Sequence, residues 1–107
     1  MNICLVSGRP VRPAIAFGES KALKFVLATD HRRHDDPSKK WTSYVPCVVF
    51  DPTKFHQTTL CNEEARKQFV QGQGRISRTS YETSKGDRRY STEVVLDPDT
   101  LVIRGGR

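Results

Sequence analysis

The stretch from Gly72 to Val95 combines positive charge, hydroxyl groups and aromatic rings in two strand-like runs around a turn. It reads GQGRISRTSYETSKGDRRYSTEVV and includes two tyrosines, Tyr81 and Tyr90. Cations neutralise phosphates and aromatic rings stack on nucleobases, so this combination is typical of a surface for a polyanion with accessible bases. Lysine and arginine on a strand edge also prevent edge-to-edge aggregation, and this simpler role stays open. The basic residues of the stretch are Arg75, Arg78, Lys85, Arg88 and Arg89.

Two other groups of residues have types that are used in metal binding or covalent chemistry. His31 and His34 stand beside two aspartates, but zinc needs three or four converging ligands, and no CxxC pair or third histidine supports such a site. Cys47 with a histidine would be a nucleophile, but its place in an apolar run predicts a buried thiol. No phosphate loop, nucleophile elbow or paired-carboxylate motif is present. We therefore expect no catalytic residue, no metal site and no cofactor.

Composition is that of one soluble domain covering residues 1–107. Eighteen Lys and Arg against twelve Asp and Glu give a formal charge of +6, which favours acidic partners and nucleic acid before others. The N-terminus lacks the features of a secretory signal, and no apolar run approaches the roughly 20 residues of a membrane span. Three widely spaced cysteines without a CxxC indicate reduced thiols. We expect a cytoplasmic, nucleoid-associated protein that does not bind membranes.

Hydrophobic patterns and turn residues predict mainly strands. Strands are expected at 2–9, 22–30 and 41–50, and a polar hairpin loop joins the second to the third. The segment 51–71 predicts one short or broken helix, with Asp51 as N-cap, Pro52 at the first helical position and a possible interruption at Asn62. The hairpin 72–95 follows, with SKGD at its turn. Three strands, a helical connection and a hairpin are the order of an all-β, five-stranded Greek-key OB-fold barrel.

Strand alternation predicts which side chains face outward. In the run 41–50, Tyr44 and Phe50 lie on the face opposite the barrel interior. In the run 70–81, Arg75 and Tyr81 share a polar face, although a bulge near Gly74 would shift this assignment by one residue. Tyr90 has the parity of Val94 and Leu96, which favours a structural role for its ring. The residues expected inside the barrel from the first run are Val45, Cys47 and Val49.

Over nearly its whole length, the chain resembles the bacterial single-stranded DNA-binding proteins. The matching pieces are KFVLATD, VVF at 48–50 and, most specifically, 72–95, whose spacing from Gly74 through Tyr81 to RYSTEVV follows the family hairpin without a gap. The resemblance implies a protein that binds single-stranded DNA with little sequence preference during replication, recombination, repair or transfer of a mobile element. It also implies self-assembly into homodimers or homotetramers.

The resemblance further implies which residues contact DNA. Family aromatics that stack on bases fall on Tyr44, Phe50 and Tyr81. A fourth falls near Arg33, where a guanidinium or the nearby Trp41 would replace it. The residues expected to bind single-stranded DNA are Tyr44, Phe50, Tyr81, Arg75, Arg33, Trp41, Lys85, Arg88 and Arg89.

Alternative functions remain open within and outside this class. One is a primosomal accessory protein or a single-stranded RNA binder with the same barrel, since the sequence does not show a partner for the 2′-hydroxyl. Another is a structural or adaptor oligomer whose exposed aromatics meet protein. Members of the family usually continue into a glycine-rich tail with an acidic tip that recruits replication and repair proteins, whereas this sequence stops at GGR. We expect a tailless or trimmed form, for which recruitment of replication or recombination proteins is an open expectation.

Overall fold

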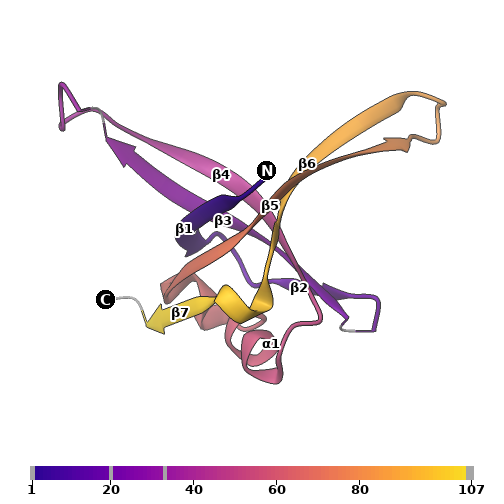
Figure 1. The fold of residues 1–107 in the computed structure, drawn as a ribbon, viewed down its shortest axis with the longest axis horizontal. Coiled ribbons are helices and arrows are strands. Elements are labelled where there is room, and N and C mark those ends of the chain that lie inside the picture. Colours follow the sequence, from indigo (N-terminus) through magenta and orange to yellow (C-terminus); the bar gives the residue numbers. More distant parts are fainter. Residues whose placement is uncertain (1, 20, 33, 106–107) are drawn as a thin grey trace.

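Strands dominate the computed structural model of the chain, which describes residues 2–19, 21–32 and 34–105 (Figure 1). Strand pairing follows the order β1-β3-β4-β6-β5-β7, β2 pairs with β3, and a further β1–β5 pairing closes five strands into a barrel. The five-stranded OB-fold expected from the sequence is therefore confirmed. The elements are β1 (Cys4–Pro10), β2 (Ile15–Phe17), β3 (Ala22–Arg32), β4 (Lys40–Phe50), α1 (Lys54–Leu60), the 3-10 helix η1 (Glu63–Lys67), β5 (Gln68–Glu82), β6 (Arg88–Leu96), the 3-10 helix η2 (Pro98–Thr100) and β7 (Val102–Gly105).

The core lies inside the barrel and is closed at one end by α1. Alternate residues of each strand point inward, and in β4 these are the residues predicted from the sequence. Cys47 and Val49 are buried, and the partly buried Val45 packs against the core. Leu60 of α1 joins this cluster from below the strands. Full burial of each such aliphatic side chain contributes roughly 1.5–3 kcal/mol. The largest fully buried side chains are Leu23, Leu27, Leu60, Leu96, Val49, Val70 and Cys47.

Two long hairpins extend from the barrel as diverging arms (Figure 1). The β3–β4 arm is paired without interruption from Ala22–Phe50 to Arg32–Lys40, and the β5–β6 arm from Gly74–Leu96 to Glu82–Arg88. No bulge breaks either ladder, so the facing predicted for Arg75 and Tyr81 is correct. Gly74 is needed at the base of the second arm because a Cβ there would collide with the Val95 carbonyl.

The helical segment differs from its prediction. Asp51 has a φ of 52°, in the left-handed region, which is incompatible with the extended backbone of an N-cap. Helix α1 instead begins after Thr53, whose hydroxyl accepts a hydrogen bond from the His56 N–H at 3.1 Å. Asn62 does interrupt the helix, because its side chain caps η1.

The residues 68–71, expected at the end of the helical segment, belong to β5. They pair with β7 on one side, and Val70 also pairs with Gly8 of β1 on the other. Burial of Val70 in the core and these two ladders outweigh a helical spacing that was only approximate. The short strands β2 and β7 were not predicted, because three or four residues are too few to show a period of two.

Candidate nucleic-acid interface

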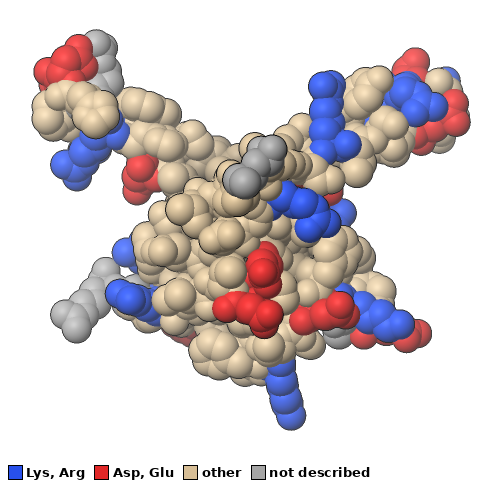
Figure 2. Space-filling view, viewed as in Figure 1, with Lys and Arg blue, Asp and Glu red and all other residues tan. Residues whose placement is uncertain are grey.

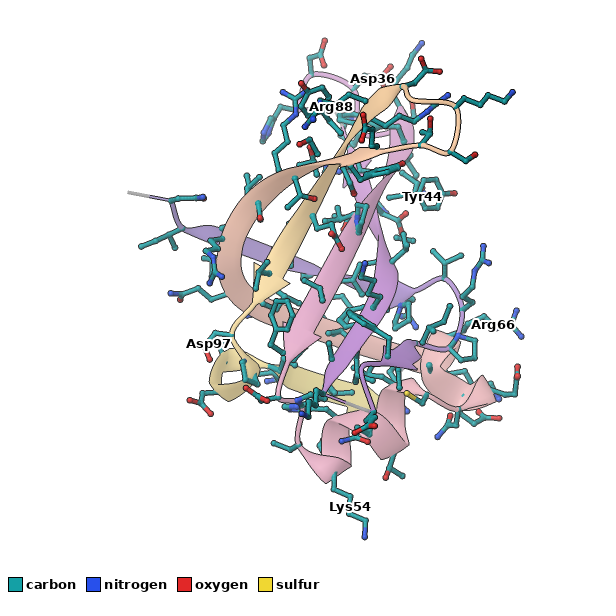
Figure 3. All side chains as sticks on the ribbon, turned by 90° about the vertical axis from the view of Figure 1, so that its right-hand side faces the viewer. Asp36, Tyr44, Lys54, Arg66, Arg88 and Asp97 are labelled. Carbon is teal, nitrogen blue, oxygen red and sulfur yellow. The ribbon has the colours of Figure 1, made fainter. Side chains whose placement is uncertain are left out.

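The outer face of β4 exposes two aromatic rings. Tyr44 and Phe50 alternate with the buried residues Cys47 and Val49, and they are 66% and 49% exposed. In Figure 3 the labelled Tyr44 projects away from the sheet. Solvent-exposed rings along an open sheet provide stacking positions for bases, since every base has a π face.

The outer face continues from β4 across β6 to β5. Val48 of β4 pairs with Val95 of β6, and Val95 pairs with Arg75 of β5, so all three point to the same side of the sheet. Farther along this arm Tyr81 lies opposite Arg89 on the same face. Tyr81 is 52% exposed, and among the described residues its ring has no aromatic or cation contact.

Two of the predicted residues lie on the opposite faces of the arms. Trp41 has the parity of the interior residues of β4, and its ring stacks on His31 with centroids 5.2 Å apart and planes at 16°. Arg88 pairs with Glu82, the residue after Tyr81, so its side chain points to the face opposite Tyr81. Its guanidinium donates a hydrogen bond to the Ser80 hydroxyl at 2.9 Å.

Of the two remaining predicted residues, only Lys85 lies within the described part of the chain. Lys85 is exposed in the turn of the β5–β6 arm. Arg33 lies outside the residues that the structure describes. The residues that share the outer face are therefore Tyr44, Phe50, Arg75, Tyr81 and Arg89.

Tyr90 does not reach the core, although it has the parity of core residues. Its ring is exposed, and the Arg78 guanidinium lies 4.4 Å from the ring centroid. The two residues are diagonal neighbours on paired strands, since Ser80 pairs with Tyr90 and Arg78 with Thr92. This contact holds the two strands of the arm together on the face opposite Tyr81. The sequence places Tyr90 on the correct face but contains no signal for where the barrel ends and the free arm begins.

Charge is distributed unevenly over the molecule. On the face shown in Figure 2, both arms carry Lys and Arg side chains together with acidic side chains near their tips, and further acidic side chains gather near the middle of the body. The segment 72–95 alone has five Lys and Arg against three Asp and Glu. On the outer face, the Lys24 ammonium lies 3.8 Å from the Glu93 carboxylate, a partly exposed pair of small energetic value.

The buried titratable groups belong to the core rather than to a reactive site. Burial, with a smaller effect of nearby Cys4, raises the pKa of the Cys47 thiol to about 12, which keeps it protonated and unreactive. Burial also lowers the pKa of His56, whose Nδ1 accepts from the Thr53 N–H at 3.2 Å. Within the described ranges, no three His, Cys, Asp or Glu side chains come together as metal ligands.

Known proteins match this chain in sequence and in fold. A single-stranded DNA-binding protein of Clostridium tetani is 37% identical over 101 residues, which are 91% of this chain and 67% of that protein. The chain belongs to the single-stranded DNA-binding protein family. No protein-family model matches it.

Two solved structures share the fold of this family member. The Plasmodium falciparum SSB complex with ssDNA has a TM-score of 0.68 at 18% identity, with 100% of this chain and 96% of that chain covered. The mitochondrial single-stranded DNA binding protein Rim1 of S. cerevisiae has a TM-score of 0.65 at 13% identity, with 98% and 96% covered. Among the described residues, no helix is long and apolar enough to cross a membrane.

Proposed function

We propose that this chain binds single-stranded DNA with little sequence preference, by stacking bases on exposed rings and neutralising phosphates with nearby cations. The observation that carries this proposal is the row of exposed Tyr44, Phe50 and Tyr81 on one continuous outer face, with Arg75 and Arg89 beside them. Stacking contributes roughly 1 to 3 kcal/mol per base and is nearly independent of base identity. Binding of this kind protects and organises DNA and makes or breaks no bond, so the protein is not an enzyme.

The biological setting follows from the binding mode. A protein that covers single strands without sequence preference acts wherever duplexes are opened, in replication, recombination, repair or transfer of a mobile element. We place it in the cytoplasm at the nucleoid, where replication or recombination proteins are its further partners.

We also propose that the protein assembles with itself, as a homodimer or a homotetramer. Leu5 is 74% exposed and Ile3 is 60% exposed, both at the N-terminal end of the chain on or next to β1. Grouped apolar side chains on a surface are typical of protein contacts. One barrel of this type covers only roughly 4 to 16 nucleotides, so several joined barrels would bind a longer strand. Light scattering at micromolar concentration tests this directly, and a monomer would contradict it.

Anisotropy of a labelled strand is the direct test of DNA binding, because the single tryptophan, Trp41, lies on the face opposite the proposed interface. The protein is titrated with oligo(dT), with a duplex and with an RNA strand of equal length. We expect a saturable signal with oligo(dT) at concentrations where the duplex gives none. A stronger response to RNA would make the protein an RNA binder. No response to any of the three would favour the adaptor alternative.

A further inference from the structure

An additional exposed ring lies in line with Phe50 on the outer face. Phe17 of β2 pairs with Ala22 of β3, and Ala22 pairs with Phe50 of β4. The three side chains therefore form one row across three neighbouring strands. Phe17 is 39% exposed, whereas Ala22 between the two rings is only 3% exposed, although it lies on the outer face. The row therefore presents two exposed phenyl rings, one on each side of a buried alanine.

A cation accompanies the added ring. The Lys24 ammonium lies 5.0 Å from the centroid of the Phe17 ring. Lys24 is on the same face, because it pairs with Ile15 of β2 and with Val48 of β4. The Lys24 side chain is 53% exposed and its 3.8 Å pair with Glu93 is partly exposed and weak, so the ammonium can turn to a phosphate at modest cost. A ring and a cation also share one face at Tyr81 and Arg89, which are paired across β5 and β6.

The outer face is also hollowed beside this row. A hollow of about 360 Å³ lies between the β2 side and β6, with Arg12, Ile15, Lys24, Pro46 and Glu93 in its lining. Its lining combines apolar side chains with two cations, Arg12 and Lys24, and one carboxylate, Glu93, so a planar base fits the apolar part and a phosphate fits only beside the two cations. The hollow adjoins the face of Tyr44 and Phe50 through Pro46, which lies between them on β4.

We propose that Phe17 and Lys24 form a further nucleotide position, which extends the path of the DNA from Phe50 across β3 to β2. This inference rests on the proposed function and concerns only where the strand runs. Tyr44 and Phe50 are six residues apart on one strand, about 20 Å, and Phe17 is two strands from Phe50, about 10 Å. The added position lengthens the stretch between Tyr44 and Phe50 by about half, so it contributes to binding only for strands long enough to reach it.

Oligonucleotide length is the variable that tests this position. The parent chain, Phe17→Ala and Phe55→Ala are each titrated into labelled oligo(dT), and anisotropy measures the affinity. The strands range from about 4 to about 16 nucleotides per barrel. Phe55 is the matched control, because its ring is exposed on α1 and outside the outer face. We expect Phe17→Ala to weaken binding of the longest strands about 5- to 150-fold and to leave the shortest unchanged. Phe55→Ala is expected to match the parent at every length.

Two further variants keep the test decisive if Phe17→Ala folds poorly. Phe17→Leu retains apolar bulk without a ring and is expected to show the same length-dependent loss. Lys24→Gln keeps part of the aliphatic side chain and removes the positive charge. It is expected to make the slope of log affinity against log salt shallower by about 0.7, for long strands only.

The outcomes separate this inference from the proposed function. If the parent chain binds oligo(dT) and Tyr81→Ala weakens it, while Phe17→Ala and Phe17→Leu bind like the parent at all lengths, the added position does not exist but the function stands. If Phe17→Ala changes the mass found by light scattering, Phe17 is a subunit contact and the inference is wrong. If the parent chain binds no oligo(dT), the proposed function fails first.

Discussion

At the scale of single residues, the two faces of the β5–β6 arm separate two tyrosines that look equivalent in the sequence. Tyr81 and Tyr90 are similarly exposed, at 52% and 58%. Tyr90 is already engaged by the Arg78 guanidinium, on the face that continues the barrel interior. Tyr81 has no such contact and lies on the face shared with Arg75 and Phe50. Facing, rather than exposure, is therefore what assigns the stacking role to Tyr81.

Tyr81→Ala is expected to weaken binding of oligo(dT) by about 1 to 3 kcal/mol, because it removes one stacking ring. The free energy of unfolding should change by no more than about 0.5 kcal/mol, as for most surface substitutions. Tyr81→Phe should retain most of the affinity, since the ring and not the hydroxyl stacks. Anisotropy titration and thermal melting measure the two quantities.

Tyr90→Ala is the matched control for that substitution, since it removes the same side chain from the same arm. It is expected to leave oligo(dT) affinity close to that of the parent. A variant at Tyr81 that binds like the parent but melts much earlier would assign Tyr81 to packing and remove the stacking argument at this position.

The buried Cys47 thiol should make the protein less stable in alkaline solution. Burial raises the pKa of its thiol from 9.0 to about 12, so above pH 9 the unfolded chain releases a proton that the folded chain retains. The free energy of unfolding should therefore fall as the pH rises from 9 toward 12, by at most about 1.4 kcal/mol per pH unit from this group. Urea denaturation at pH 8, 9 and 10 measures the fall.

Cys47→Ala is the control for this pH dependence. Other groups titrate in the same range, so the informative quantity is the difference between the two chains. That difference should shrink as the pH rises, because only the parent loses the contribution of the thiol. A constant difference from pH 8 to pH 10 would show that the thiol is not buried as described.

At the scale of elements, sequence patterns predict an element well when it is long and one of its faces is buried. The runs 22–30 and 41–50 alternate regularly and form β3 and β4 with the predicted facing. The start of β5 at Gln68 was missed, because its pairing with β1 and β7 depends on segments far away in the chain. The N-cap was assigned to Asp51 because Asp-Pro is a common helix start, whereas the left-handed backbone of Asp51 moves the start to Thr53.

The capping box of α1 predicts acid sensitivity at this element. Burial lowers the pKa of His56 below its usual 6.5, so the unfolded chain takes up a proton more readily than the folded chain. The free energy of unfolding should therefore be constant near neutrality and fall as the pH drops below about 6.5. Protonation also removes the Nδ1 lone pair that accepts from the Thr53 N–H. Denaturation at pH 7, 6 and 5 measures this.

His56→Gln is the matched control, because glutamine at this position of a capping box accepts the same backbone hydrogen bond and does not titrate. It should reduce the dependence on pH between 7 and 5 while α1 is retained in the circular dichroism spectrum. Thr53→Ala should instead cost about 0.5 to 2 kcal/mol at every pH, because the N-cap hydroxyl is lost. Equal acid sensitivity of His56→Gln and the parent would exclude His56 as the cause.

At the scale of the whole molecule, the barrel decides which predicted residues meet. Parity within β4 and within β5 was readable from the sequence, but the β4–β6 pairing that joins their outer faces is parallel and non-local. The same limit hid the row of Phe17, Ala22 and Phe50, because β2 is too short to be recognised before its pairing with β3 is known. Trp41 and Arg88 were correctly placed on the arms but not on the outer face.

Salt dependence is the property that belongs to the molecule as a whole. The chain carries a formal charge of +6, and its arms project basic side chains into solvent (Figure 2). Log affinity for oligo(dT) should therefore fall linearly with log salt, with a slope of about −0.7 for each phosphate neutralised.

Arg75→Gln removes a cation from the outer face and should make the slope shallower by about 0.7. Arg66→Gln removes an equal charge from η1, far from the arms in Figure 3, and should leave the slope unchanged. Equal slopes for all three chains would place the phosphates elsewhere than along Arg75. A flat response in the parent chain would contradict the electrostatic part of the proposed binding.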